Sequence, residues 1–292
     1  MGGVLLSVLI CPVCGERLRP APGALRCEKR HSFDIARQGY VNLLPPAPSS
    51  RRHGDDLAMV AARTDFLNTG AYAPLRDALC EAALRYAAAA PVLLDAGIGE
   101  GYYTAAVMSA LAAAGNAPAV IGVDISKTAL AAAARRFPKA DLLRPGTDRA
   151  DLPPVTLAVG SVFHLPVPDG SVDLLLSVFA PDAPAEFLRV LKPGGVLMRV
   201  EPGQRHLMGL KATVYEKPYL NPAPTYDRQG FASLAARELT GSLTLTDPAR
   251  IRALFLMTPY YYKTSRADQA KLEGLSSLTT EIAFTVFCLR KI

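Results

Sequence analysis

The stretch VLLDAGIGEGYYT, residues 92–104, decides the fold of this chain. Its apolar start, residues 92–94, is typical of a buried parallel strand, and this strand leads into Asp95. Three glycines follow on alternate positions: Gly97, Gly99 and Gly101. Glycines at a strand end allow a sharp turn and let a ligand approach the backbone closely. The helix expected over residues 102–114 then directs its free N–H groups at that ligand.

A second apolar run, residues 119–123, leads into Asp124, about 23 residues after Gly101. A carboxylate at the tip of the second strand is placed to accept hydrogen bonds from both hydroxyls of a ribose. Together these features resemble motif I of the class I S-adenosylmethionine (SAM) methyltransferases, D-x-G-x-G-x-G, with its acidic partner. A dinucleotide-binding fold more often has G-x-G-x-x-G. If the glycines served turns alone, the fit of the flanking strands and Asp124 would be unexplained.

Length and charge restrict the kind of protein. The chain has 292 residues, enough for one large domain and one small one. Its formal net charge is +6, which mildly favours an acidic partner such as nucleic acid. No apolar segment is long enough to predict a transmembrane span. The five cysteines are odd in number, and three of them lie near the start, so we expect a reducing, cytoplasmic compartment rather than a disulfide framework.

Near the start of the chain, three cysteines and a histidine have the spacing C-x2-C-x12-C-x3-H. They are Cys11, Cys14, Cys27 and His31. This spacing predicts a closed, tetrahedral, structural zinc site. A segment of about 40 residues cannot rely on its own hydrophobic core, so the metal would supply folding energy. The alternative is a set of free core cysteines with a histidine nearby by chance.

Basic residues are concentrated on this small module: Arg17, Arg19, Arg26, Lys29, Arg30 and Arg37. They lie in the same segment as Phe33 and Tyr40, which could stack on unpaired bases. The alternative is that these charges are only solvated. The Pro- and Ser-rich residues 45–50 are typical of a linker. We therefore expect a zinc-binding RNA-recognition domain over residues 1–45, a linker and helix over 46–75, and a SAM-dependent methyltransferase domain over 76–292.

The remaining pattern predicts an α/β fold with alternating strands and helices. Further helices are expected over residues 56–68, 75–90, 126–137 and 184–191, and further strands over 157–160, 172–179, 195–200, 243–246 and 283–289. Residues 138–154 are polar and contain prolines, which favours an irregular surface insertion. The loop after the third strand begins at Ser161, where such folds usually hold the adenine edge. His206 follows the fifth strand, at the edge where open α/β sheets bind ligands.

Taken together, these features resemble the RlmA family, bacterial 23S rRNA guanine-N1 methyltransferases with an N-terminal zinc finger. The segments that carry the resemblance occur in family order over nearly the whole chain: CPVCGERL, CEKRHSFDIARQGYVNLLP, GAYAPLRDAL, DAGIGEGYYT, GVDISKTA, FAP, LKPGG, PGQRHLMGLK and LMTPYYY. Two departures stand out. Ile98 replaces a residue that is commonly Cys in the family, and the segment 141–154 is longer than expected.

The resemblance implies a fold, partners and site residues. The fold is a Rossmann-like class I methyltransferase with a mostly parallel seven-stranded sheet and a small zinc-binding domain. The partners are a hairpin of 23S rRNA and a second copy of the chain, and one family branch is linked to macrolide resistance. Zinc would be structural. The cofactor contacts expected from the motif and the family are Tyr72, Asp95, Gly97, Gly99, Glu100, Gly101, Asp124, Ser161 and His206.

Methylation of guanine N1 requires more than alignment with the methyl carbon, because N1 carries a proton and is a poor nucleophile until that proton leaves. The sequence offers three candidates for the base, His206, Glu201 and Asp182, and does not decide between them. Phe179 is a candidate for stacking on an unpaired or flipped guanine.

Two other functions compete with this one. The first is a SAM-dependent methyltransferase of a small metabolite, which would rarely need a basic zinc finger. The second is a zinc-dependent RNA-binding protein with a degenerate SAM fold, and the intact motif I and Asp124 argue against it.

Overall fold

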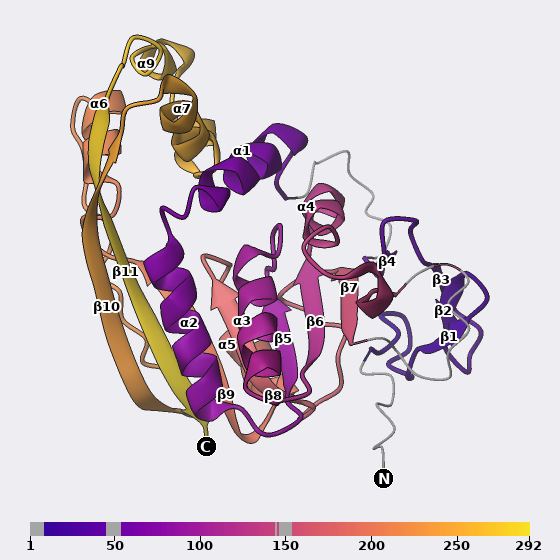
Figure 1. Ribbon diagram of the computed structural model, residues 1–292. Helices are drawn as coiled ribbons and strands as arrows, with labels where there is room; N and C mark the ends of the chain where they lie inside the picture. Colours follow the sequence, from indigo (N-terminus) through magenta and orange to yellow (C-terminus); the bar gives the residue numbers. More distant parts are fainter. Residues whose placement is uncertain (1–8, 45–53, 144, 146–153) are drawn as a thin grey trace.

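The computed structural model describes residues 9–44, 54–143, 145 and 154–292. The linker predicted over 45–50 and most of the insertion predicted over 141–154 lie outside these residues. Within these residues, the chain forms two sheets. One is large, mixed and flanked by helices, and the other is a small three-stranded sheet that lies beside it (Figure 1).

The large sheet contains eight strands among the described residues, in the order β10-β11-β9-β8-β5-β6-β7-β4. Its parallel strands are β4 (Tyr40–Asn42), β5 (Val92–Ala96), β6 (Ala119–Asp124), β7 (Val155–Val159), β8 (Val172–Val178) and β9 (Leu191–Pro202). β11 (Leu278–Lys291) runs antiparallel between β9 and β10 (Phe231–Leu245). This insertion of the last strand distinguishes the sheet from the dinucleotide-binding order 3-2-1-4-5-6.

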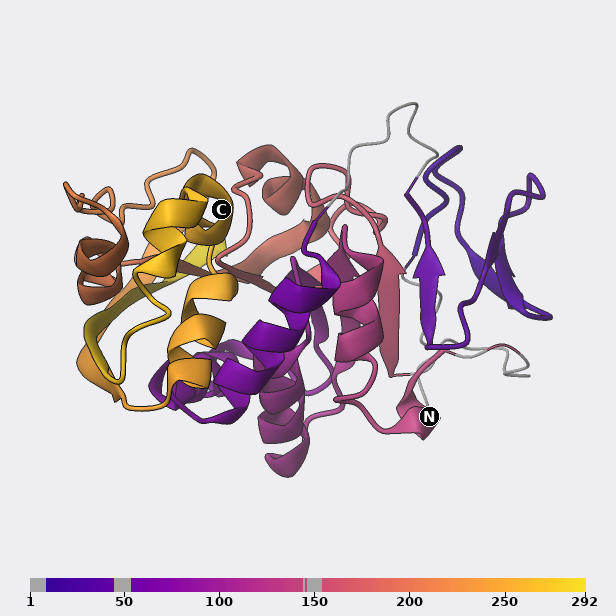
Figure 2. The same ribbon diagram turned by 90° about the horizontal axis from the view of Figure 1, so that it is seen from above.

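Helices cover both faces of the sheet, as Figures 1 and 2 show. α2 (Ala73–Tyr86), α3 (Tyr102–Ala113) and α4 (Lys127–Ala133) lie on one face, and α5 (Pro184–Val190) lies on the other. α1 (Leu57–Asn68) crosses the carboxyl ends of the parallel strands and contacts α7 (Pro248–Leu256). The remaining helices are short: a 3-10 turn (Lys139–Asp141), α6 (Met208–Val214), α8 (Tyr260–Lys263) and α9 (Arg266–Ala270). No helix in the described ranges is long and apolar enough to cross a membrane.

Alternation along the central strands divides the core into two layers. Leu93 packs into the cluster that includes α2 and α3, and its neighbour Leu94 packs into the cluster on the opposite face. β5 is buried along nearly its whole length, as its continuous apolar run predicted. This buried strand fixes the position of the glycine loop that follows it.

The last two strands are much longer than the sequence pattern predicted. We expected strands over residues 243–246 and 283–289, whereas β10 and β11 pair continuously from Leu245 with Leu278 to Phe231 with Lys291, apart from one bulge. β9 likewise begins at Leu191, four residues earlier than expected, and includes the KPGG segment. β10 and β11 therefore form a long antiparallel pair along one edge of the sheet, and the segment that connects them carries α7, α8 and α9 (Figure 1).

The small sheet consists of β1 (Arg19–Ala21), β2 (Ala24–Arg26) and β3 (Ser32–Asp34). We call residues 9–39 the ribbon. β4 directly follows it and pairs in parallel with β7, so the large sheet has eight strands where the resemblance implied seven. The ribbon also packs against the main domain, because Leu18 and Leu25 share a buried cluster with Ile121 and Val123. The boundary near residue 45 therefore follows a strand that belongs to the main sheet.

Candidate active site and metal centre

A cavity of about 700 Å³ opens at the carboxyl ends of the parallel strands. Its walls come from the loops after β5, β7 and β8, from the end of β9, and from α1 together with residues 257–260. Ligands of open α/β sheets bind at this edge. Most of the cofactor residues predicted from the sequence line this cavity: Tyr72, Asp95, Gly97, Gly99, Glu100, Asp124, Ser161 and His206. Gly101 lies one residue beyond the lining, at the N-cap of α3.

The glycine loop passes so close to its neighbours that side chains are excluded. A Cβ on Gly97 would lie 2.6 Å from the Cβ of Ala180, and its φ of +99° is a conformation that other residues rarely adopt. A Cβ on Gly101 would meet Ala133 at 3.2 Å. The loop therefore keeps its backbone open toward the cavity and its helix N-terminus close to α4. Ile98, the departure from the family pattern, packs over Gly122, where a Cβ would meet its Cδ1 at 2.4 Å.

Asp95 places a buried carboxyl group in the cavity wall. Thr104 donates a hydrogen bond to Oδ2, whereas Oδ1 has no partner within the described part of the chain. Burial raises the pKa of Asp95 to about 7, and the nearby acidic groups Asp124 and Glu100 add to this shift. A buried carboxylate oxygen without a partner is costly, so this atom fits a cationic ligand group.

Asp124 lies at the end of β6, where its carboxylate is oriented by two backbone amides. Gly99 N–H donates to Oδ2 at 2.9 Å and Ser126 N–H donates to Oδ1 at 2.8 Å. Burial raises its pKa, and the two N–H donors oppose that shift. Ser126 is also the N-cap of α4, as predicted. The carboxylate therefore has a fixed orientation and retains lone pairs for the hydroxyls of a ribose.

Arg63 on α1 is a site residue that the sequence did not reveal. It donates to Asp55 at 2.5 Å and lies 3.7 Å from the carboxylate of Glu100 in the glycine loop. Burial raises the pKa of Glu100, and the Arg63 charge counters this. These contacts connect α1 to the glycine loop over the cavity. The amphipathic pattern of α1 predicted a helix but gave no signal for which of its side chains faced a ligand.

His206 is buried beside Tyr72, which caps the start of α2. Its Nδ1 accepts a hydrogen bond from the backbone N–H of Ala283, and its Nε2 lies 3.4 Å from the Tyr72 hydroxyl. Burial, with a smaller contribution from the charge of Lys211, lowers the pKa of His206 to about 3. The imidazole is therefore neutral, and its proton lies on Nε2, facing Tyr72.

The other two candidates for the base lie in different surroundings. Glu201, near the end of β9, lines the cavity and accepts a hydrogen bond from Arg199 at 3.0 Å. Asp182 is outside the cavity lining and accepts hydrogen bonds from Tyr226 and Arg228, both at 3.1 Å. Phe179, the proposed stacking residue, lines the cavity and is 44% exposed.

The four predicted zinc ligands come together on the ribbon. Their ligand atoms all lie within 4.8 Å of one another, with Cys14 Sγ 3.7 Å from Cys27 Sγ and Cys27 Sγ 3.3 Å from His31 Nδ1. A tetrahedral site with Zn–S bonds of about 2.3 Å separates its sulfurs by about 3.8 Å, so the donor set fits zinc. Two tight turns hold the ligands: Gly15 N–H bonds to Cys11 O, and Arg30 N–H bonds to Cys27 O.

The cavity also fits SAM. The cofactor has a cationic amino group for the buried oxygen of Asp95 and a ribose for Asp124. When bound there, the cofactor would supply a methyl group on a sulfonium, and the largely apolar lining of the cavity would orient it.

Comparisons with known proteins agree with this geometry. A family model described as "Methyltransferase domain" matches residues 94–198, and one described as "RlmA, N-terminal", a zinc ribbon, matches residues 9–48. Fold and site thus define a class I SAM-dependent methyltransferase that carries an N-terminal zinc ribbon.

Three relatives indicate which family within this class the chain belongs to. The 23S rRNA (guanine(748)-N(1))-methyltransferase of Streptomyces fradiae is 40% identical over 209 residues, covering 70% of this chain and 67% of the relative. A Micromonospora griseorubida protein described as a 23S rRNA (guanine-N1)-methyltransferase is also 40% identical, with 70% and 69% covered. A similarly described protein of Bacillus subtilis is 31% identical over 94% of this chain and 86% of its own length. The chain belongs to the RlmA family.

Proposed function

We propose that this protein transfers a methyl group from SAM to N1 of a guanosine in a hairpin loop of 23S rRNA. One observation carries the proposal. β4 directly follows a zinc ribbon of the RlmA type, and this strand belongs to the same sheet as the motif I cavity. The names of the three relatives support the substrate and the atom. Because its substrate is ribosomal RNA, we propose a cytoplasmic location.

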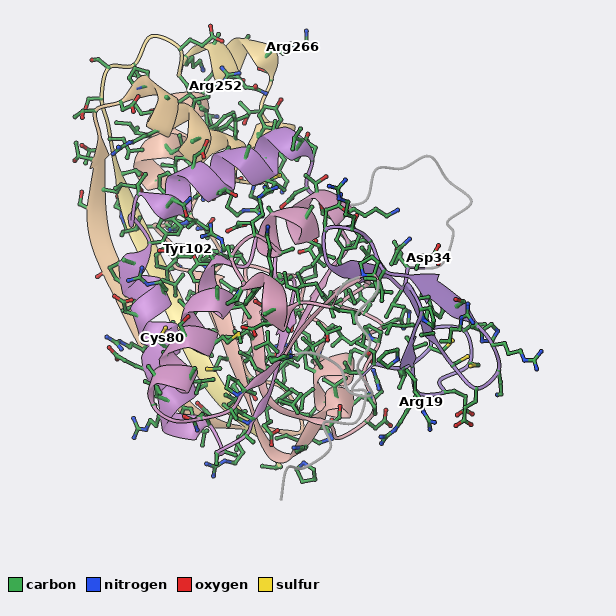
Figure 3. The ribbon with its side chains drawn as sticks, turned by 45° about the vertical axis from the view of Figure 1, so that its right-hand side comes forward. Arg19, Asp34, Cys80, Tyr102, Arg252 and Arg266 are labelled. Carbon is green, nitrogen blue, oxygen red and sulfur yellow. The ribbon has the colours of Figure 1, made fainter. Side chains whose placement is uncertain are left out.

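The ribbon is proposed as the RNA-recognition part. Its basic side chains are all exposed: Arg17, Arg19, Arg26, Lys29, Arg30 and Arg37. Figure 3 places Arg19 and Asp34 on the ribbon, away from the helices that carry Arg252 and Arg266. Phe33 and Tyr40 are half-buried against the core, so packing accounts for them better than base stacking does. Exposed cations therefore supply the proposed contact with phosphates.

The cavity is proposed as the cofactor site, with the nine residues named from the sequence as its contacts. Asp95 would take the amino group, Asp124 the ribose and Ser161 the adenine edge. The proposed domain division remains 1–45, 46–75 and 76–292, with β4 as the strand that joins the first part to the last. A homodimer, with two ribbons gripping one hairpin, completes the proposal.

Incubation with labelled SAM and unmodified 23S rRNA tests this function. We expect label in the RNA fraction, at one site, and none when Asp124 is replaced by Ala, because the ribose then loses its acceptor. A small-molecule extract serves as the competing substrate. Label confined to that extract, with SAM still bound, would favour the metabolite methyltransferase instead. Absence of SAM binding in calorimetry would favour an RNA-binding protein without activity.

A further inference from the structure

The base that removes the N1 proton can be chosen from the geometry. This choice rests on the proposed function. His206 has no lone pair free for the task, because Nδ1 accepts the Ala283 amide and the ring proton on Nε2 faces Tyr72. Asp182 accepts hydrogen bonds from Tyr226 and Arg228 and does not line the cavity. Both ring nitrogens of His206 and both carboxylate oxygens of Asp182 are therefore engaged by other groups of the protein, which argues against either residue as the base.

Glu201 differs from them in its position and in its unused hydrogen-bonding capacity. It lies near the carboxyl end of β9 and lines the cavity. Arg199 donates to Oε1 at 3.0 Å, and no hydrogen bond reaches Oε2 from the part of the chain that the structure describes. One oxygen is thus fixed by the protein, and the other is available to a ligand.

Arg199 is itself held rigidly. Only 6% of this residue is exposed. Its Nη1 donates to Ser177 Oγ at 2.9 Å, and its guanidinium lies over the Tyr226 ring at 5.6 Å. An arginine immobilised in this way gives the carboxylate of Glu201 a defined direction, because its planar donors fix the acceptor geometry.

Phe179 lies in the loop after β8, on the same cavity. It has a φ of +54°, which is unusual for an aromatic residue, and strained backbone of this kind concentrates at functional sites. Its ring is nearly parallel to that of His206, 14° between planes at 6.4 Å, and 44% of the residue is exposed. An exposed aromatic face that lines the same cavity as the Glu201 carboxylate is suited to a flipped purine.

We propose that Glu201 is the general base for guanine N1, that Arg199 is its positioning residue, and that the purine stacks on Phe179. The N1 proton passes to the free oxygen of Glu201. The N1 lone pair then forms a bond to the methyl carbon, while the C–S bond breaks and its electron pair stays on sulfur. The products are 1-methylguanine, S-adenosylhomocysteine and a protonated Glu201, which releases its proton to water. Charge balances, because a carboxylate and a sulfonium are both neutralised.

Single-turnover methyl transfer to 23S rRNA, at saturating SAM, tests this assignment with Glu201→Gln. We expect the rate to fall about 10²- to 10³-fold, as is typical for loss of a general base. SAM affinity should stay within about twofold of wild type in calorimetry. The rate of the variant should rise about tenfold per pH unit above neutrality, since only deprotonated guanine then reacts. Glu238→Gln, at an exposed position on β10, is the matched control and should keep wild-type activity.

Arg199→Lys separates positioning from structure. We expect it to lower the single-turnover rate about tenfold on its own and to have no further effect in the Glu201→Gln background, because Arg199 acts through Glu201. Additive losses in the double variant would overturn the positioning role. A Glu201→Gln rate within tenfold of wild type would overturn the base, as would loss of SAM binding in both Glu201→Gln and Glu201→Asp. If wild-type enzyme labels no RNA, the proposed function fails first, and the base assignment fails with it.

Discussion

We expect Asp95 to make cofactor binding depend on pH. Its pKa is about 7 in the folded protein and near 3.8 in the unfolded chain, so between these values only the folded state holds the proton. The stabilisation that this proton gives the ligand-free protein is therefore lost as the pH rises through 7. SAM brings a cation, which favours ionised Asp95. We expect its affinity to rise about five- to tenfold between pH 6 and pH 8.

The Asp95→Asn variant is the control for this prediction. Its side chain keeps the size and loses the charge, so its SAM affinity should be weaker and nearly constant over the same range. Titration calorimetry at pH 6, 7 and 8 measures both proteins. An equally steep pH dependence in the variant would assign the effect to another group.

Gly97→Ala should remove cofactor binding and destabilise the fold. The new Cβ would lie 2.6 Å from Ala180 in a backbone conformation with φ of +99°. We expect a loss of about 2–4 kcal/mol in the free energy of unfolding, from strain and overpacking together. Gly115→Ala has a φ of +86° but no atom within 4 Å, so it should show the strain alone, about 1 kcal/mol, and normal SAM binding. Equal losses in urea unfolding would contradict the packing argument.

The residues that the sequence revealed differ in kind from those it missed. Gly97, Gly99, Asp95 and Asp124 lie at strand ends or in the loops after them, where spacing is set locally, and the structure brings them to one cavity. Arg63 and Arg199 acquire their roles only through tertiary contacts, with Glu100 and with Ser177. No local pattern encodes a contact between residues that far apart, so their part in the site could not be read from the sequence.

At the scale of elements, β10 shows where local pattern fails. Its sequence, FASLAARELTGSLTL, is rich in Ala, Leu, Glu and Arg, which are strong helix formers, and many of its residues are exposed. Pairing along the whole length of β11 overrides that preference, because strand formation depends on neighbours more than on intrinsic propensity. The central strands, by contrast, are continuous apolar runs between glycine and proline signals, and their positions were predicted to within a few residues.

α1 contributes a prediction of its own, because it carries Arg63 across the cavity. Arg63→Gln leaves the buried carboxylate of Glu100 without its cation. We expect the free energy of unfolding to fall by about 1–3 kcal/mol and SAM affinity to weaken, since the variant loosens α1 from the glycine loop. Arg76→Gln removes a more exposed pair with Asp77 on α2 and should change stability by less than about 0.5 kcal/mol. Similar effects of the two variants in urea unfolding would argue against the α1 contact.

In the whole molecule, β4 connects the ribbon to the sheet that carries the cavity, but the ribbon and the cavity depend on different interactions. Cys27→Ser should unfold the ribbon and weaken binding of 23S rRNA at least tenfold, because the zinc site holds together a segment whose strands are only three residues long. SAM affinity should stay within about twofold, since none of the four zinc ligands lines the cavity. Filter binding and calorimetry measure the two affinities. Parallel loss of both would show that the cavity depends on the metal.

The position of β4 at the edge of the large sheet explains why the point variant Cys27→Ser tests the ribbon better than a deletion of the N-terminal part does. Removing residues 1–45 would take β4 away from β7. It would also expose the core residues that pack against Val41 and Leu43, because these two side chains are themselves buried. The sequence predicted the two parts of the molecule and their order. It could not predict this shared strand, because three residues, Tyr40–Asn42, give no strand signal of their own.

The most direct test of the proposed reaction is mass spectrometry of nucleosides from unmodified 23S rRNA, after incubation with the protein and SAM. We expect 1-methylguanosine, at a single position in a hairpin loop, and its absence with the Asp95→Asn variant at low SAM concentration. A methyl group on another base, on another atom of guanine, or in no nucleoside at all would contradict the assignment of reaction and substrate.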